Sequence, residues 1–302
     1  MNMPIETFLT ALYTTIDDWM QKNAPLFLAG KVGAKPLFSD SEVLTLSVAQ
    51  HWLGFGEERE FLRFIRNNTL PLFPQMVCQS QFNRRARNLC WLLNRMRRDI
   101  VHTMGLLSTD YRLVDGTPIH VRHWRRYGNR GTGHLLLPEA ALGHCAAKKE
   151  TFYGYRLIVL TTVEGIPTDW GLVSANVDER EGALDILWDY QNITALGDKG
   201  FLDAERQSQL LEERGILLLT PKRHNQKDAN PDGWDSFLNR VRRVIETTFA
   251  QAKGVFGLEK PKARSSWGVL SRLIAKITGL TLAAYQNTQN GRPPLELAEF
   301  CF

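Results

Sequence analysis

Up to about residue 105, apolar positions recur every three or four residues, which is the period of amphipathic helices. A capping box of Ser39 and Glu42 predicts the start of one helix. Two more helices are predicted at about 57–67 and 80–104, and glycine and proline breaks separate them. We therefore expect residues 1–105 to form an all-helical domain.

From residue 111 the pattern changes to short apolar runs that alternate with helical ones. This order predicts an α/β domain over residues 106–290, in which helices flank a mixed sheet of five strands. A basic insertion at 120–150 and a C-terminal tail at 291–302 complete the expected organisation. The strands are predicted at 111–114, 154–163, 170–177, 193–197 and 216–219, and the helices at 179–190, 203–214, 234–256 and 266–288.

The charges are unevenly distributed along the 302 residues, whose formal net charge is +5. Residues 1–58 carry a net charge of −4, from three Lys against seven acids. Residues 59–104 carry +7, from nine Arg against two acids, and residues 219–276 carry +7, from twelve Lys or Arg against five acids. Such segregation favours a polyanionic partner, for example nucleic acid.

The four cysteines form no Cys-x-x-Cys pair, which is typical of free thiols in a reducing compartment. The first residues lack the basic start and the apolar stretch of a signal peptide. The longest apolar region, at about 269–285, contains Arg272 and Lys276 and is too short and too charged to span a bilayer. We expect a cytoplasmic protein that does not contact the membrane.

The helix predicted at 80–104 has one apolar stripe and is otherwise rich in arginine. Short helices that are joined by tight breaks and end in a basic helix indicate a helix-turn-helix-like DNA-binding module. A helical bundle with a basic, solvated face explains the same pattern and stays open as the alternative. Arg84 and Arg85 are the candidate DNA contacts, and Arg87, Arg95, Arg97 and Arg98 also decorate the expected polar surface.

Three acidic residues stand out by their context. Asp115 and Asp198 each end a short apolar run, and Glu246 lies within a helical run. Any one of them alone is more typical of a turn or a cap. If the fold gathers all three, their carboxylates can hold one or two hard cations, the kind that act on both oxygens of a phosphodiester bond. Acids on the first strand, at the end of the fourth and on a late helix match the order of a ribonuclease H-like fold.

The helix around Glu246 also carries basic residues at helical spacing. Arg242 lies four residues before Glu246 and Lys253 seven residues after it, so the three share one face. Such neighbours can hold phosphates beside the carboxylate. A structural ladder of alternating charges on a solvated helix explains the spacing equally well.

These motifs resemble a known family. Arg242-x3-Glu246-x6-Lys253 resembles the glutamate signature of bacterial insertion-sequence DDE transposases, and Asp115 and Asp198 lie in sequences that resemble the two aspartate motifs of that superfamily. The gaps between the three acids are compatible with it. The similarity extends from the helical start to about residue 288.

Two further segments indicate one particular family among these transposases. Val-Ile-Glu-Thr-Thr-Phe at 244–249 and Thr-Pro-Lys-Arg-His-Asn-Gln at 220–226 are most similar to the insertion sequence 982 family. One position departs from the pattern, because related groups place a Tyr three residues before the Arg, where Asn239 stands here. A role of that Tyr is therefore not transferred to this chain.

The resemblance implies a transposase that cuts double-stranded DNA at the terminal inverted repeats of its element and joins the ends to target DNA. It implies that Asp115, Asp198 and Glu246 are catalytic and bind two Mg²⁺ ions, with Mn²⁺ as a substitute. Recombination at two DNA ends leads us to expect a homodimer on DNA. The candidate DNA contacts in this part of the chain are Lys253, Arg242, Lys222, Arg223 and Lys199.

The insertion at 120–150 is long for a connection between strands, and such loops are usually functional or disordered. We interpret its basic residues, Arg125 and Arg126 among them, as DNA contacts. His120, His123, His144 and Cys145 could instead form a zinc site, although their spacing matches no zinc motif.

Asp178, Glu179 and Glu181 follow the third predicted strand. We interpret them as acids at the start of a helix, where they interact favourably with its dipole. Asp178 is kept as a reserve candidate for the metal site.

Two other functions stay open. One is a sequence-specific DNA-binding regulator with a degenerate active site, against which the intact Asp115, Asp198 and Glu246 argue. The other is a ribonuclease H-like endonuclease that cuts without joining, which the sequence does not distinguish from a transposase.

Overall fold

The computed structural model describes residues 3–28, 36–122, 137, 139–145, 149–201, 203–221 and 233–297. Four predicted DNA contacts, Lys222, Arg223, Arg125 and Arg126, lie outside the described residues, as does His123.

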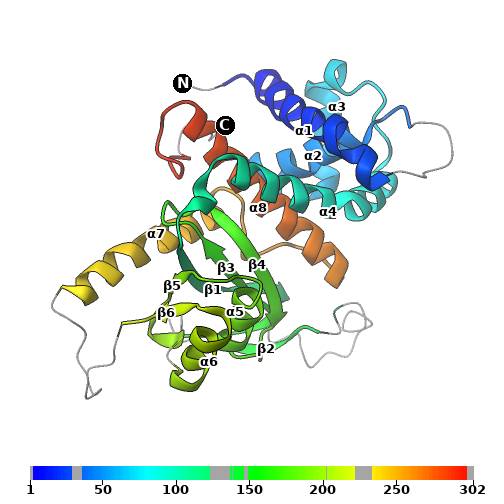
Figure 1. Ribbon diagram of the computed structural model, residues 1–302. Helices are drawn as coiled ribbons and strands as arrows, with labels where there is room; N and C mark the ends of the chain where they lie inside the picture. Colours follow the sequence, from blue (N-terminus) through cyan, green and yellow to red (C-terminus); the bar gives the residue numbers. More distant parts are fainter. Residues whose placement is uncertain are drawn as a thin grey trace.

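The N-terminal part of the chain is helical, as the apolar period predicts (Figure 1). The predicted capping box is confirmed: the Ser39 hydroxyl accepts a hydrogen bond from the backbone N–H of Glu42, and the Glu42 carboxylate accepts one from the backbone N–H of Ser39. The helices are α1 (Ile5–Leu28), α2 (Asp40–Trp52), α3 (Glu58–Asn68) and α4 (Gln79–Thr103), with 3-10 turns at Leu70–Leu72 and Leu106–Ser108.

Six strands of the described residues form one mixed sheet. The central strand β1 is antiparallel to β3 and parallel to β5, and β6 extends the sheet parallel to β5. On its other side, β3 pairs with β2 along its first half and with β4 along its second. The strands are β1 (Tyr111–Arg122), β2 (Ala141–Cys145), β3 (Glu150–Thr161), β4 (Pro167–Ser174), β5 (Thr194–Leu196) and β6 (Leu217–Leu219).

Helices cover both faces of this sheet. Alternate residues of a strand face opposite layers, and Leu113 and Leu157 accordingly pack into the core that α7 and α8 share, whereas Val114 and Ile158 pack under α5 and α6. This mixed α/β architecture is compatible with a ribonuclease H-like fold. The helices after β4 are α5 (Glu179–Leu187), α6 (Ala204–Arg214), α7 (Trp234–Gly254) and α8 (Ser266–Gln289), with a 3-10 turn at Lys199–Phe201.

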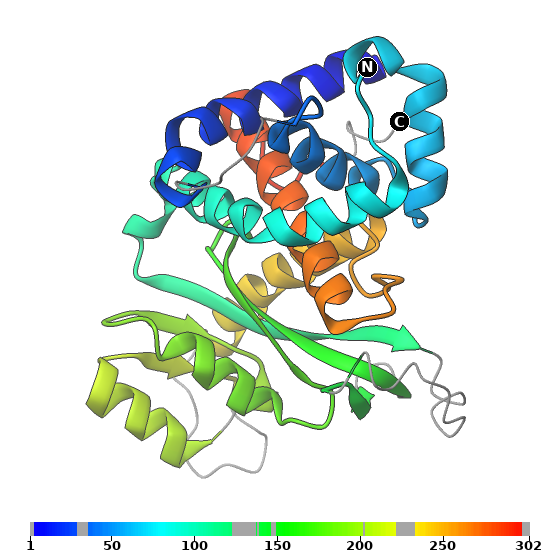
Figure 2. The same ribbon diagram turned by 90° about the vertical axis from the view of Figure 1, so that its right-hand side faces the viewer.

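Helix α8 follows the sheet in sequence but packs among the N-terminal helices, against α2 and α4 (Figure 2). Its Trp267 indole donates to the backbone oxygen of Arg87 at 3.2 Å, and the Thr278 hydroxyl lies 3.5 Å from the backbone oxygen of Leu93. Neither α8 nor any other helix in the described ranges is long and apolar enough to cross a membrane. Because α8 belongs to the same core as α2 and α4, the boundary near residue 105 stays a prediction.

The sheet differs from its prediction in three ways, one of which is that β3 and β4 begin at Glu150 and Pro167, earlier than the predicted 154 and 170. The described residues contain six strands rather than five, because Ala141–Cys145, within the expected insertion, pairs with β3 as β2. In addition, β1 does not end at Asp115-Gly116 but runs on to Arg122. The dipeptide Asp115-Gly116 by itself favours a turn. It stays extended here because both residues pair with the long strand β3, with Asp115 opposite Val159.

Arg97 corrects the prediction that the arginines of α4 decorate its surface. The side chain is fully buried, and its Nη1 donates to the backbone oxygens of Pro167 and Thr168 at 2.8 and 3.0 Å. Burial lowers the pKa of Arg97 to about 10, and the charge of Asp169 opposes this shift. Arg97 therefore ties α4 to the first residues of β4.

Candidate active site

The two predicted aspartates lie just beyond the last paired residues of the parallel strands β1 and β5. β1 and β5 pair with Leu113 opposite Leu196. Asp115 and Asp198 each follow two residues later along their strands. The register of this pair therefore brings both aspartates to the same edge of the β1–β5 ladder, which is where ligands bind in open α/β sheets.

On α7, Arg242 contacts both Glu246 and Asp198, so Glu246 lies near this edge of the sheet. The Arg242 Nη2 atom lies 3.3 Å from Glu246 Oε1 and 3.8 Å from Asp198 Oδ2. The predicted shared face of Arg242 and Glu246 is confirmed by this i,i+4 contact. One guanidinium group therefore contacts carboxylates from two different elements.

The Asp115 carboxyl group is in a setting that disfavours its charge. The pKa of Asp115 is raised to about 7, chiefly by burial and in addition by the charges of Asp198 and Glu179. The backbone N–H of Gly116, 2.7 Å from Oδ1, and the Arg242 guanidinium act in the opposite direction. Excess negative charge around a buried carboxyl group favours either a proton or a bound cation.

Glu179 is a fourth carboxylate at this place, which the sequence interpretation missed. Its Oε1 atom lies 3.4 Å from the position that a Cβ on Gly116 would take, and its Oε2 atom lies 3.8 Å from the corresponding position on Gly200. The Arg156 Nε atom of β3 lies 3.4 Å from Oε1. Burial raises the pKa of Glu179, and Arg156 opposes that rise. The sequence signal was the pair of glycines, one shortly after each aspartate, that leave room for this side chain.

Asp178 caps α5, as predicted. Its Oδ1 accepts a hydrogen bond from the backbone N–H of Arg180 at 2.9 Å, and the Arg180 guanidinium lies 2.6 Å from Oδ2. These contacts lower the pKa of Asp178 to about 2. Glu181 pairs with Arg206 of α6 at 3.3 Å. The carboxylates of Asp178 and Glu181 are thus engaged in α5 and α6, in contrast to Glu179.

Lys253, a predicted DNA contact, is held near the end of α7. Its Nζ atom lies 2.9 Å from Glu259 Oε1, which also accepts a hydrogen bond from Thr117 Oγ1 at 3.0 Å. The ammonium group also lies 5.5 Å from the centroid of the Phe249 ring. Through Glu259, Lys253 is positioned beside β1, two residues along that strand from Asp115.

The remaining predicted DNA contacts differ in their surroundings. Lys199 and Arg84 are exposed. Arg85 is partly buried and donates to the backbone oxygen of Phe38 and to Asp40 Oδ1, both at 2.6 Å. Arg85 therefore fixes α4 to the start of α2, and a contact to DNA would compete with this link. All three stay predictions as DNA contacts.

The donor set fits a hard cation. Asp115, Asp198 and Glu246 offer carboxylate oxygens, which Mg²⁺ prefers, and burial, followed by the charges of Asp198 and Glu179, raises the pKa of Asp115. In this conformation, no three acidic, histidine or cysteine side chains within the described ranges converge closely enough to hold a metal ion. Arg242 lies between two of the three carboxylates.

The zinc alternative for the insertion gains no support in the part of the chain that the structure describes. His120 Nε2 pairs with Glu150 Oε1 at 3.0 Å. His144 lies on β2.

A family model described as a transposase DDE domain matches residues 107–266. Domains of this family act on DNA as nucleases and transferases and generally use divalent metal ions. Searches of curated proteins and of solved structures found no match. The match covers the whole sheet together with Asp115, Asp198 and Glu246, and it does not distinguish among insertion-sequence families. Since it spans more than half of the 302 residues, this chain belongs to the transposase DDE domain family.

Proposed function

We propose that this protein is a transposase that cleaves double-stranded DNA at the terminal inverted repeats of its element and transfers the ends to target DNA. The observation that carries the proposal is the contact of one Arg242 guanidinium with both Asp198 and Glu246, beside the partly buried Asp115. The motif resemblance adds the insertion sequence 982 family as the finer assignment.

Asp115, Asp198 and Glu246 would hold two Mg²⁺ ions, for which Mn²⁺ substitutes. The chemistry that bound ions supply is activation of the attacking oxygen and stabilisation of the leaving 3′ oxygen. The oxygen-only donor set and the raised pKa of Asp115 support this assignment. Glu179 joins the three acids in the proposal, because its carboxylate lies between the glycines that follow the two aspartates.

Arg242 has a second role in this proposal. When its guanidinium donates to a DNA phosphate, Asp198 and Glu246 lose their ion-pair partner, and their negative charge becomes available to cations. Substrate binding and cation binding would thus reinforce each other. Lys253 and the exposed Lys199 would hold phosphates on either side of the cleaved bond.

The N-terminal helices would recognise the terminal inverted repeats as a helix-turn-helix-like module. The support is the basic composition of residues 59–104 and the exposure of Arg84. A homodimer on DNA is proposed because two element ends are processed in one reaction.

The test uses labelled duplexes that carry the element ends, with Mg²⁺ or with a chelator. Asp115→Asn, Asp198→Asn and Glu246→Gln preserve side-chain size and should each lower the cleavage rate by about a thousandfold. Glu205→Gln, which changes an exposed acid on α6, should leave the rate unchanged. Binding to the ends, measured by gel mobility shift, should persist in all four variants.

Cleavage that survives in all three active-site variants would contradict the assignment of the acids. Joined products distinguish a transposase from an endonuclease that only cuts. Tight, sequence-specific binding by the natural chain without any Mg²⁺-dependent cleavage would instead favour the regulator.

A further inference from the structure

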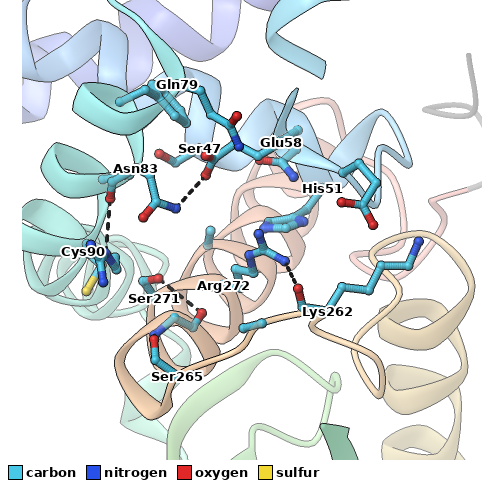
Figure 3. A pocket seen from close by; sticks show the side chains of 18 of the residues that line it. Ser47, His51, Glu58, Gln79, Asn83, Cys90, Lys262, Ser265, Ser271 and Arg272 are labelled. Carbon is cyan, nitrogen blue, oxygen red and sulfur yellow. Dashed lines mark hydrogen bonds between the residues drawn. The ribbon is translucent and has the colours of Figure 1, made fainter. Parts of the chain in front are cut away.

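A cavity of about 590 Å³ lies away from the sheet, between α2, α3, α4 and the first turns of α8 (Figure 3). None of its lining residues belongs to a strand or to α7, so it is separate from the candidate active site. Its size is that of sites for small organic ligands.

The solvent side of this cavity is mainly basic, although the exposed Glu57 also lines it. Arg59, Lys262 and Arg264 line it and are exposed, and none of them makes a salt bridge to another described residue. The 24-residue helix α8 also begins here, with Ser265 as its N-cap and Gly268 in the wall, so the positive end of its dipole adds to the same field. This side is suited to a phosphate group.

The inner side has a different chemistry. Glu58 lines the cavity and is only 6% exposed. Its Oε2 atom accepts a hydrogen bond from Asn83 Nδ2 at 2.9 Å, whereas its Oε1 atom accepts none within the described part of the chain. A buried carboxylate oxygen without a donor is costly, so this side is suited to a ligand with an N–H group.

Nearby groups complete the inner wall. Burial lowers the pKa of His51 well below its ordinary value, and the charges of Lys276 and Arg272 add to that shift, so the imidazole is neutral at pH 7. The Arg272 guanidinium donates to the backbone oxygens of Pro261 and Lys262. Figure 3 shows Glu58, Asn83, His51 and Arg272 around the same space.

We propose that this cavity binds one nucleotide of a DNA strand, with the phosphate at Arg59, Lys262 and Arg264 and the base directed to Glu58. Cytosine, adenine and guanine each carry an exocyclic amino group that can donate to a carboxylate, whereas the single N–H of thymine, at N3, lies between two carbonyl oxygens that repel a carboxylate. The source of the nucleotide, DNA rather than the free pool, rests on the proposed transposase function.

The segment between α7 and α8 connects this cavity with the candidate active site. At one end Glu259 holds Lys253 and Thr117, and at the other the backbone oxygen of Lys262 holds Arg272. One segment therefore contributes contacts at both places.

The test measures binding of the full chain to the four deoxynucleoside monophosphates in metal-free buffer. The natural protein should bind dCMP, dAMP and dGMP about fivefold or more tightly than dTMP. Glu58→Gln should abolish this preference. The double variant Arg59→Gln/Arg264→Gln, which changes only exposed side chains, should weaken all four by about tenfold, and Lys22→Gln on α1 is a control for the loss of an exposed positive charge elsewhere.

A second experiment, with duplex DNA, distinguishes a nucleotide within DNA from a free nucleotide. A labelled duplex with one unpaired cytosine at its end should bind more tightly than the blunt duplex, and Glu58→Gln should remove the difference. Equal affinity for all four monophosphates, or no effect of the double variant, would overturn the site. Discrimination among the free nucleotides without any effect of the unpaired cytosine would overturn DNA as the source. None of these measurements requires cleavage, so a failure of the proposed catalysis would be seen separately.

Discussion

Asp115 is the described acid whose charge the fold disfavours most clearly. Its pKa in the folded protein is about 7, against 3.8 for the free side chain. The folded state binds this proton more tightly than the unfolded state does between these values. The Asp115 contribution to stability is therefore greatest below about pH 4 and is lost as the pH rises through 7.

Asp115→Asn removes this dependence on pH. The free energy of unfolding of the variant, relative to the natural protein, should therefore rise by about 2 kcal/mol between pH 5 and pH 8. Urea unfolding in a chelator at the two pH values measures the change. Added Mg²⁺ should narrow the difference at pH 8, since a cation neutralises the ionised group. A difference that stays constant over this pH range would contradict the charge argument.

Glu179 gives a second prediction for a single residue. Its carboxylate lies against Gly116 and Gly200, so Glu179→Gln should lower the cleavage rate by about ten- to a hundredfold through a weakened hold on Mg²⁺. The concentration of Mg²⁺ at half-maximal rate should rise with it. Glu181→Gln, two residues along the same helix, is the matched control and should leave both quantities unchanged. If both variants lowered the cleavage rate equally, Glu179 would have a structural role in α5 and no role in holding Mg²⁺.

At the scale of elements, the sequence predicts what local chemistry determines. The capping box at Ser39 fixes the start of α2, and alternation along β3 fixes which residues face each layer. The prediction fails where pairing with a segment far away in the sequence determines the local structure. The Asp115-Gly116 dipeptide stays in β1 because β3 pairs across it, and β2 is a strand only because β3 offers it a free side.

Arg97 shows the same limit within a helix. The arginines of α4 look alike in sequence, yet Arg97 is buried against β4 and Arg98 is largely exposed. Arg97→Ala would leave the backbone oxygens of Pro167 and Thr168 without their donor and should lower the free energy of unfolding by about 3 kcal/mol.

Arg98→Ala is the neighbouring control for this prediction. Arg98 contacts Asp169 at 3.5 Å on the surface, where such a pair contributes less than about 1 kcal/mol. Thermal unfolding of both variants, followed by circular dichroism, compares them directly. A smaller loss for Arg97→Ala than for Arg98→Ala would show that the buried contacts do not stabilise the junction between α4 and the sheet.

For the whole molecule, the sequence motifs identify acids that lie far apart in the chain, but not all of their neighbours. Asp198 and Glu246 carry recognisable surroundings in the sequence, and both contact Arg242. Glu179 has no such motif around it, and the glycines that follow the two aspartates point to it only once the packing of α5 against the sheet is known. The sequence of α8 likewise predicts a helix, but it does not predict which helices α8 packs against.

The packing of α8 leads to a prediction about the division of the chain. The apolar side chains of α8 are buried among α2 and α4, and Trp52 of α2 meets Phe256 with ring centroids 5.6 Å apart. A fragment of residues 106–302 would expose this apolar surface to water. It should therefore aggregate or unfold at a lower temperature than the full chain, as size-exclusion chromatography and thermal unfolding would show.

Co-expression of the two fragments distinguishes two independent domains from two parts of one shared core. If α8 completes the N-terminal layer, fragments 1–105 and 106–302 should associate when produced together, and the pair should recover a soluble complex that elutes with the full chain. The N-terminal fragment alone should also be unstable, because it lacks the helix that fills its core. A fragment 106–302 that is monomeric and unfolds at the temperature of the full chain would instead establish two independent domains. In that case the effect of removing residues 1–105 on DNA binding would report DNA recognition alone, whereas with a shared core the same removal would also disrupt folding.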